Sequence, residues 1–112
     1  AESILGALEL GDLGKHFPDN DPKYEGISSL ILLDEVVKMM KERNFRVNNI
    51  DVQVSLKSPK LANHILKMRE VIAKHLDTDI ENVSIKACSY NGVGTIGEGK
   101  AIKASSYVML EK

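Results

Sequence analysis

The 112-residue chain is 43% hydrophobic and 28% charged, which suits one domain with one hydrophobic core. Its formal net charge of −1 offers no electrostatic attraction to nucleic acid or to an anionic membrane surface. No apolar run approaches the roughly 20 residues that a membrane-crossing helix needs, so neither a nucleic-acid nor a membrane partner is predicted. The single cysteine, Cys88, excludes an internal disulfide framework and fits a reducing compartment.

The chain begins inside a helical pattern. Ile4, Leu5 and Leu8 share one face of a helix predicted over residues 1–10, and Gly11 fits its C-cap. Because the sequence starts without a methionine and already inside this pattern, we expect a further segment upstream of Ala1.

A rigid acidic loop follows over residues 10–22. It combines three aspartates, two glycines and two prolines directly after an apolar helical run. Proline and glycine hold loops in one conformation, and binding groups are often placed on such loops. We therefore interpret this segment as a shaped surface loop that carries binding groups.

A second helix is predicted over residues 29–43, with Ser28 or Ser29 as its N-cap. Its apolar positions recur at helical spacing, and Met39 is interpreted as core filling beside them. The predicted apolar face consists of Leu30, Leu33, Val36, Val37 and Met40.

From Val47 the hydrophobic period changes to two, which predicts a strand that ends at Ser58-Pro59. A third helix carries Leu61 and Ile65 at its start and ends near Asp77. Strands over residues 82–89 and 101–110 follow, joined by a turn-rich connection. This order predicts one α+β domain over residues 1–112, with a single layer of helices packed on a β-sheet and a closing hairpin.

The histidines and the cysteine give no catalytic signature. His16, His64 and His75 show no spacing that places two on one helical turn, as a zinc pair requires. Cys88 has no basic neighbour beyond Lys86, so a buried strand cysteine is the expected role. A nucleophilic triad has no support.

Two polar segments follow the ends of predicted strands. Residues 57–60 could hold a phosphate or a base edge through backbone donors and two lysines, or form a solvated basic turn. Residues 88–91 end the neighbouring strand of a βαβ-type arrangement, with hydroxyl and amide groups that suit a phosphate or an ordinary turn. These residues predict a polar cleft facing the acidic loop of the same or another subunit, without defining a reaction.

Residues 10–22 closely resemble the signature loop of the 2-C-methyl-D-erythritol 2,4-cyclodiphosphate synthase family, which has the pattern G-D-I-G-x-x-F-P-D-x-D-P. The resemblance continues through residues 23–26, residues 47–51, Pro59-Lys60, His64 and residues 97–99, so it covers the whole chain in order. It implies a homotrimer with active sites between subunits.

The resemblance also implies a reaction of non-mevalonate isoprenoid biosynthesis. The 2-phosphate of 4-diphosphocytidyl-2-C-methyl-D-erythritol 2-phosphate would attack the β-phosphate and release CMP. Such intramolecular phosphoryl transfer depends mainly on positioning and charge neutralisation. The absence of a nucleophilic triad is consistent with that chemistry.

Carried over residue by residue, the resemblance implies substrate contacts from two subunits and one catalytic candidate, Ser89, whose hydroxyl would support the transferring phosphate. The ribose and the methylerythritol end would be bound by one subunit through Asp12, Leu13, Gly14, Phe17, Pro18, Asp19, Asn20 and Asp21. The cytosine pocket of the adjacent subunit would consist of Leu56, Lys57, Ser58, Pro59, Lys60, Leu61 and Ala62. The phosphate segment would be Cys88, Ser89, Tyr90 and Asn91.

The implied cofactors are Zn²⁺ and a second divalent cation, Mg²⁺ or Mn²⁺. The family's zinc ligands would lie upstream of Ala1, so no metal ligand is predicted within the 112 residues. Asn91 stands where the family has a carboxylate for the second cation. These departures leave an alternative open, a catalytically silent nucleotide-binding or regulatory module on the same scaffold.

The connection before Gly97 is about two residues shorter than in many bacterial members of the family, with Ile96 at the usual arginine position. A short connection resembles plastid-type members and predicts an apicoplast or chloroplast enzyme, with the bacterial cytoplasm as the alternative.

Overall fold

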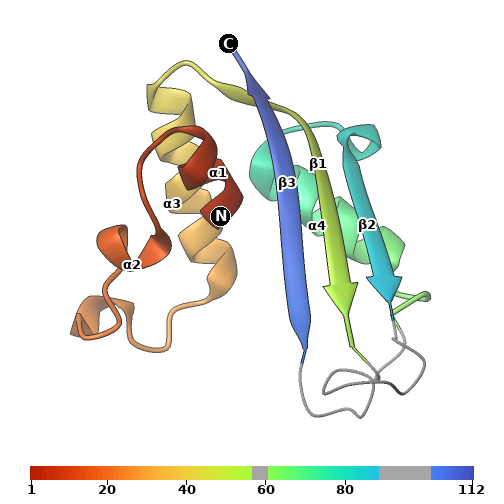
Figure 1. The fold of residues 1–112 in the computed structure, drawn as a ribbon, viewed down its shortest axis with the longest axis horizontal. Helices are drawn as coiled ribbons and strands as arrows, with labels where there is room; N and C mark the ends of the chain where they lie inside the picture. The colour runs from red at the N-terminus through yellow and green to blue at the C-terminus, as the bar shows by residue number, and fades with distance from the viewer. Residues whose placement is uncertain (57–60, 89–101) are drawn as a thin grey trace.

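The computed structural model describes residues 1–56, 61–88 and 102–112, which form a mixed α/β arrangement (Figure 1). Its helices are α1 (Glu2–Ala7), α2 (Leu13–His16), α3 (Ser29–Glu42) and α4 (Ile65–Leu76), with short 3₁₀ turns η1 (Pro22–Tyr24) and η2 (Ile80–Asn82). Its strands are β1 (Arg46–Ser55), β2 (Val83–Cys88) and β3 (Lys103–Glu111). Among the described helices, none is long and apolar enough to cross a membrane.

The three strands form one sheet in the order β2-β1-β3, with β1 parallel to β2 and antiparallel to β3. The parallel β1–α4–β2 unit confirms the predicted βαβ arrangement. The predicted hairpin between the last two strands is wrong, because β3 pairs with β1. Strand β3 pairs antiparallel with β1 along its described length, from Lys103 to Glu111.

A β-bulge lies near the start of β1. The pairing with β3 shifts between Val47 and Asn49, so Asn48 is an extra residue in the strand. Without a bulge, Val47 and Ile50 would face opposite sides of the sheet, because their spacing is odd. Both are buried, and the bulge is what allows both to reach the core. The predicted strict alternation of inward and outward side chains from Val47 is therefore wrong at Asn48.

The core lies between the sheet and the helices. Val36, Val37 and Met40 of α3 are buried as predicted, but Leu30 in the first turn of α3 is 38% exposed. In Figure 1, α4 lies behind the sheet, and the face toward the viewer is free of described helices. The remaining buried apolar side chains are Ile4, Leu5, Leu8, Phe17, Val47, Ile50, Leu56, Ala73, Leu76, Val83 and Ile85.

Two predicted helix boundaries are wrong. Helix α1 ends at Ala7 with Leu8 as C-cap, and Glu9 adopts the left-handed conformation (φ 58°) that normally favours glycine. Gly11 is therefore not the cap; it lies one turn later, at φ +88°, where the chain turns into α2. Helix α4 begins at Ile65, four residues after the Leu61 start that the apolar spacing predicted.

Two polar contacts join α3 to the C-terminal end of α4. Asp34 Oδ1 lies 2.6 Å from His75 Nδ1, and Lys41 Nζ donates to Asp77 Oδ2 at 2.8 Å. Asp77 is the left-handed C-cap of α4 (φ 56°). The hydrogen bond from Lys41, followed by the positive charge of its ammonium, lowers the pKa of the Asp77 carboxyl below its ordinary value.

Removing Lys41 should abolish the pH-dependent stabilisation that the lowered pKa of Asp77 provides. A carboxyl whose folded-state pKa is lowered stabilises the protein above its unfolded pKa, and this contribution disappears as pH falls through the lowered folded pKa. We expect Lys41→Met to reduce the melting temperature at neutral pH, with a difference from wild type that disappears as the pH falls below the lowered pKa of Asp77. Thermal unfolding across that pH range measures it. Lys67→Met, which removes a looser pair to Glu70 at 3.9 Å, is the matched control.

Candidate functional site

The acidic loop contains a short helix that fixes Asp12. Asp12 is the N-cap of α2, and its Oδ1 accepts a hydrogen bond from the backbone N–H of Lys15 at 2.9 Å. Capping is a usual role for aspartate because helix N-termini leave backbone donors unsatisfied. The side chain is exposed, and its second oxygen makes no hydrogen bond within the described part of the chain. Asp12 therefore presents one free carboxylate oxygen in a fixed orientation.

The second half of the loop is fixed by an aromatic pair and a second cap. Phe17 is only 8% exposed, and its ring packs edge-on against the ring of Tyr24, with 5.2 Å between the two ring centroids. Asp21 caps η1, since its Oδ1 accepts from the backbone N–H of Lys23 at 3.0 Å. The loop thus contains two short helical turns, α2 and η1, and is anchored in the core through Phe17. The prediction of a rigid, shaped loop agrees with this geometry.

The predicted substrate-binding residues of the loop differ in their accessibility to a ligand. Gly14, Asp19 and Asn20 are exposed like Asp12, so they are available to a ligand. Leu13, Pro18 and Asp21 are half-buried. Phe17 is different, because its ring is part of the core and a substrate could reach it only at the rim or through its backbone.

The predicted cytosine pocket and phosphate segment begin at one edge of the sheet. Ser55 pairs with Cys88, and the backbone N–H of Leu56 donates to the Cys88 carbonyl at 3.0 Å. Parallel strands β1 and β2 therefore end together, as the sequence predicted. Leu56 is buried, Leu61 half-buried and Ala62 exposed. The remaining predicted residues lie outside the described ones: Lys57, Ser58, Pro59, Lys60, Ser89, Tyr90 and Asn91.

The two predicted halves lie apart within one chain. Figure 1 shows α2 on one side of α3, while β1 and β2 end on the other side, at the lower end of the sheet. The loop around Asp12 and the strand ends at Leu56 and Cys88 therefore do not converge on one ligand within the described residues of a single chain.

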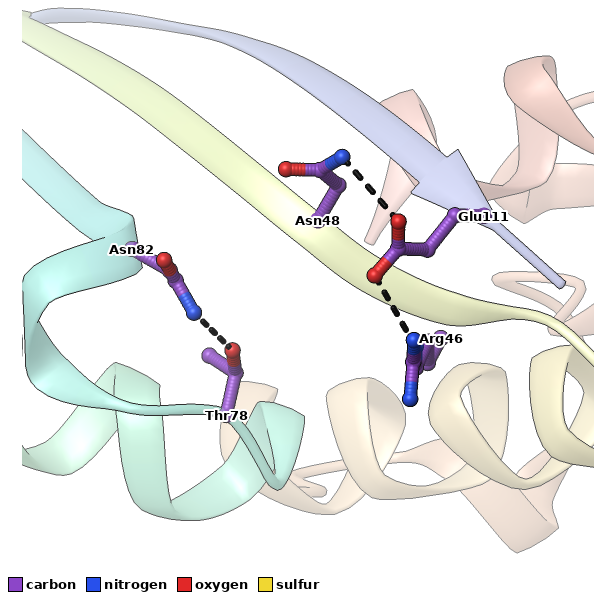
Figure 2. A network of polar contacts seen from close by, with 5 residues as sticks. All are labelled: Arg46, Asn48, Thr78, Asn82 and Glu111. Carbon is purple, nitrogen blue, oxygen red and sulfur yellow. Dashed lines mark hydrogen bonds and ion pairs between the residues drawn. The ribbon is translucent and has the colours of Figure 1, made fainter.

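A large polar hollow lies at the opposite end of the sheet. It has a volume of about 630 Å³ and lies between the start of β1 and the end of α4. Figure 2 shows Glu111 accepting from Arg46 Nε at 2.9 Å and from Asn48 Nδ2 at 3.2 Å, while Asn82 donates to Thr78 at 3.0 Å. The ten-residue strand β1, roughly 30 Å long, separates this hollow from Leu56 and Cys88. The two contacts of Glu111 join the start of β1 to the end of β3 and hold the bulge at Asn48.

Within residues 1–56, 61–88 and 102–112, no group of three histidine, cysteine, aspartate or glutamate side chains is arranged to hold a metal ion. His75 is paired with Asp34, and His16 contacts the backbone carbonyl of Leu10. The described residues therefore do not fit a resident metal, and no chemical step is assigned to one.

Two contributors to the loop were missed by sequence reasoning. From the sequence, His16 is considered only as a possible zinc ligand, and Tyr24 only as part of the family resemblance over residues 23–26, yet each makes a contact that holds the loop. Tyr24 follows buried Phe17 by seven residues, a spacing that signals nothing in a non-periodic segment. Neither contact had a detectable signature in the sequence.

The fold and this arrangement define a small α/β domain with a prearranged acidic loop and a polar edge where parallel strands end. The family model described as the YgbB family matches residues 1–111. The 2-C-methyl-D-erythritol 2,4-cyclodiphosphate synthase of Brachyspira hyodysenteriae is 51% identical over 111 residues, covering 99% of this chain and 70% of that protein. The enzyme of the same name from Desulfitobacterium hafniense is 48% identical with the same coverage. The chain belongs to the YgbB family.

Solved structures agree with this assignment. The bifunctional IspDF of Campylobacter jejuni is 36% identical, with a TM-score of 0.90, and the match covers 96% of this chain and 29% of that chain. The Plasmodium falciparum IspF in its CDP complex is 31% identical, with a TM-score of 0.84, over 96% of this chain and 64% of that chain. The similarity confirms the predicted combination of helices and sheet.

The comparisons do not support the preference for a plastid-type protein. Curated relatives at 40–51% identity come from bacteria, including Brachyspira, Desulfitobacterium, Clostridium and Alkaliphilus. The apicomplexan structure is less similar, at 31% identity. The length of one connection was therefore a poor guide, because loop lengths vary among homologues more readily than the elements they join.

Proposed function

We propose that this chain is a 2-C-methyl-D-erythritol 2,4-cyclodiphosphate synthase of non-mevalonate isoprenoid biosynthesis. It would convert 4-diphosphocytidyl-2-C-methyl-D-erythritol 2-phosphate into the cyclic diphosphate and CMP, which is the reaction of a phosphorus–oxygen lyase. The observation that carries the proposal is 51% identity to a synthase across almost the whole chain. The alternative of a silent binding module gains no support from the structure or the relatives.

The chemistry is an exchange of one P–O bond for another. An oxygen of the 2-phosphate forms a bond to the β-phosphorus, the bond between that phosphorus and the CMP oxygen breaks, and CMP leaves with the electron pair. The protein's part is to hold the two phosphates in line. In this proposal the free oxygen of Asp12 accepts from a ribose hydroxyl, and Ser89 supports the transferring phosphate.

The direct test is release of CMP from the cytidyl substrate by the purified full-length protein. We expect stoichiometric formation of CMP and cyclic diphosphate in the presence of Zn²⁺ and Mg²⁺ or Mn²⁺, and loss of both products with EDTA. The metal requirement is itself part of the proposal, and its ligands would have to lie outside the described residues. Absence of CMP release with both metals supplied would exclude this function.

We also propose that the protein assembles as a homotrimer through the open face of the sheet. On this face Tyr107 is 72% exposed and Met109 61% exposed, although both side chains are large. Asp51 lies next to Tyr107 in the pairing of β1 with β3. Its Oδ2 pairs with Lys86 at 3.1 Å, and its Oδ1 is buried without a partner among the described residues. A neighbouring copy would cover the apolar side chains and bring the two halves of the nucleotide site together.

Sedimentation should therefore give the mass of three chains at micromolar concentration. Placing charges on the open face, with Tyr107→Asp and Met109→Asp together, should yield monomers, because each carboxylate would be buried without a partner. These monomers should also lose CDP binding, which needs both half-sites. A wild-type protein that sediments as a monomer would contradict this assembly. The bacterial relatives further lead us to propose a bacterial rather than plastid-type enzyme.

A further inference from the structure

The side chain of His16 closes the turn that carries Asp12. Its Nε2 lies 2.7 Å from the backbone carbonyl oxygen of Leu10, six residues earlier. A carbonyl oxygen only accepts, so Nε2 carries the hydrogen in this contact. The turn enclosed by the bond contains Gly11, at φ +88°, and the predicted ribose-binding residues that follow it.

Both partners of this bond are themselves held in place. Leu10 is attached to the first helix, because its N–H donates to the Leu5 carbonyl at 2.9 Å. His16 directly precedes Phe17, whose ring is buried and whose N–H donates to the Leu13 carbonyl at 2.7 Å. The imidazole is thus a crosslink between two fixed points, one before and one after the Asp12 turn.

We infer that His16 is a positioning residue for nucleotide binding, acting through the turn and not by touching the substrate. This inference rests on the proposed function, since it takes the exposed oxygen of Asp12 as a ribose contact. A glycine-containing turn loses considerable backbone entropy when a ligand orders it. A crosslink that orders the turn beforehand removes part of that cost from binding.

His16→Leu, which keeps an apolar side chain but no donor, tests the crosslink. We expect its Kd for CDP to rise by roughly three- to tenfold, the range that one net hydrogen bond supports. The Michaelis constant for the cytidyl substrate should rise by the same factor, while kcat stays within about twofold, because ribose binding is equal in ground and transition states. His16→Gln, whose amide can donate to the same carbonyl, should restore both values.

His75→Leu is the matched control. It removes the other half-buried histidine, which pairs with Asp34 between α3 and α4, so its melting temperature should fall without a change in CDP affinity. Titration of CDP by calorimetry, with melting temperatures recorded for every variant, measures these effects. His16→Leu binding CDP as wild type does, or His16→Gln failing to restore binding, would overturn the role of His16. A wild-type protein that neither binds CDP nor releases CMP would instead overturn the proposed function.

Discussion

Asp12→Ala should weaken CDP binding by roughly ten- to hundredfold. A hydrogen bond to a charged group contributes about 1.5–3 kcal/mol, which corresponds to that range of affinity. The carboxylate has the required geometry, since one oxygen is occupied by the Lys15 N–H and the other is free within the described residues. Calorimetric titration of CDP into the purified protein would measure the loss.

The alanine variant alone would not separate binding from local structure, because Asp12 also caps α2. Loss of an N-cap costs about 0.5–2 kcal/mol of helix stability, whereas asparagine caps as well as aspartate does. Asp12→Asn should therefore keep the turn through its amide oxygen, while an NH₂ donor replaces the second carboxylate oxygen. The charge and the proposed acceptor are then lost, so the Kd should rise roughly tenfold or more above wild type. Glu35→Ala, which removes an exposed acid of α3, is the control and should bind CDP normally. Unchanged CDP affinity in Asp12→Ala would show that the carboxylate makes no substrate contact.

The main helices and strands could be predicted because their hydrophobic periods are regular. Residues 29–43 carry apolar side chains at helical spacing, and Ser28 supplies the cap that the sequence suggested, its Oγ accepting from the Leu30 N–H at 3.2 Å. The pairing of β3 was not predictable from such patterns. It depends on which strand lies beside β3 once the sheet has assembled, and that is a property of the whole sheet.

The two halves of the candidate site, the Asp12 loop and the ends of β1 and β2, could be predicted to different extents. The family resemblance identified the Asp12 loop, and glycine and proline correctly indicated a rigid conformation. The sequence could not show that one carboxylate oxygen of Asp12 caps helix α2. Nor could it show that the imidazole of His16 contacts the backbone carbonyl of Leu10. Both contacts depend on the path of the chain between Leu10 and His16. No composition or spacing rule encodes that path.

Phe17→Ala should cause a large loss of stability, about 3 kcal/mol or more in the free energy of unfolding. Truncating a buried phenylalanine typically costs 3–5 kcal/mol, and this ring also loses its edge-on contact with Tyr24. Urea unfolding at one fixed protein concentration is the appropriate measurement, because the proposed assembly would make apparent stability depend on concentration. Phe45→Leu, at the half-buried second phenylalanine, should cost much less and serves as the control.

Phe17→Leu distinguishes a core residue from a substrate contact. The family resemblance assigns Phe17 to the methylerythritol end of the substrate, whereas the structure buries its ring among core side chains. If the ring acts by packing, leucine should fill most of its space, and CDP affinity should stay within about threefold of wild type while stability falls by roughly 1–2 kcal/mol. The Michaelis constant of the full substrate should change by the same factor as the Kd for CDP, because the ring would then make no contact with the methylerythritol end. A selective rise of that Michaelis constant above tenfold, at unchanged CDP affinity and nearly wild-type stability, would instead place the ring edge against the substrate.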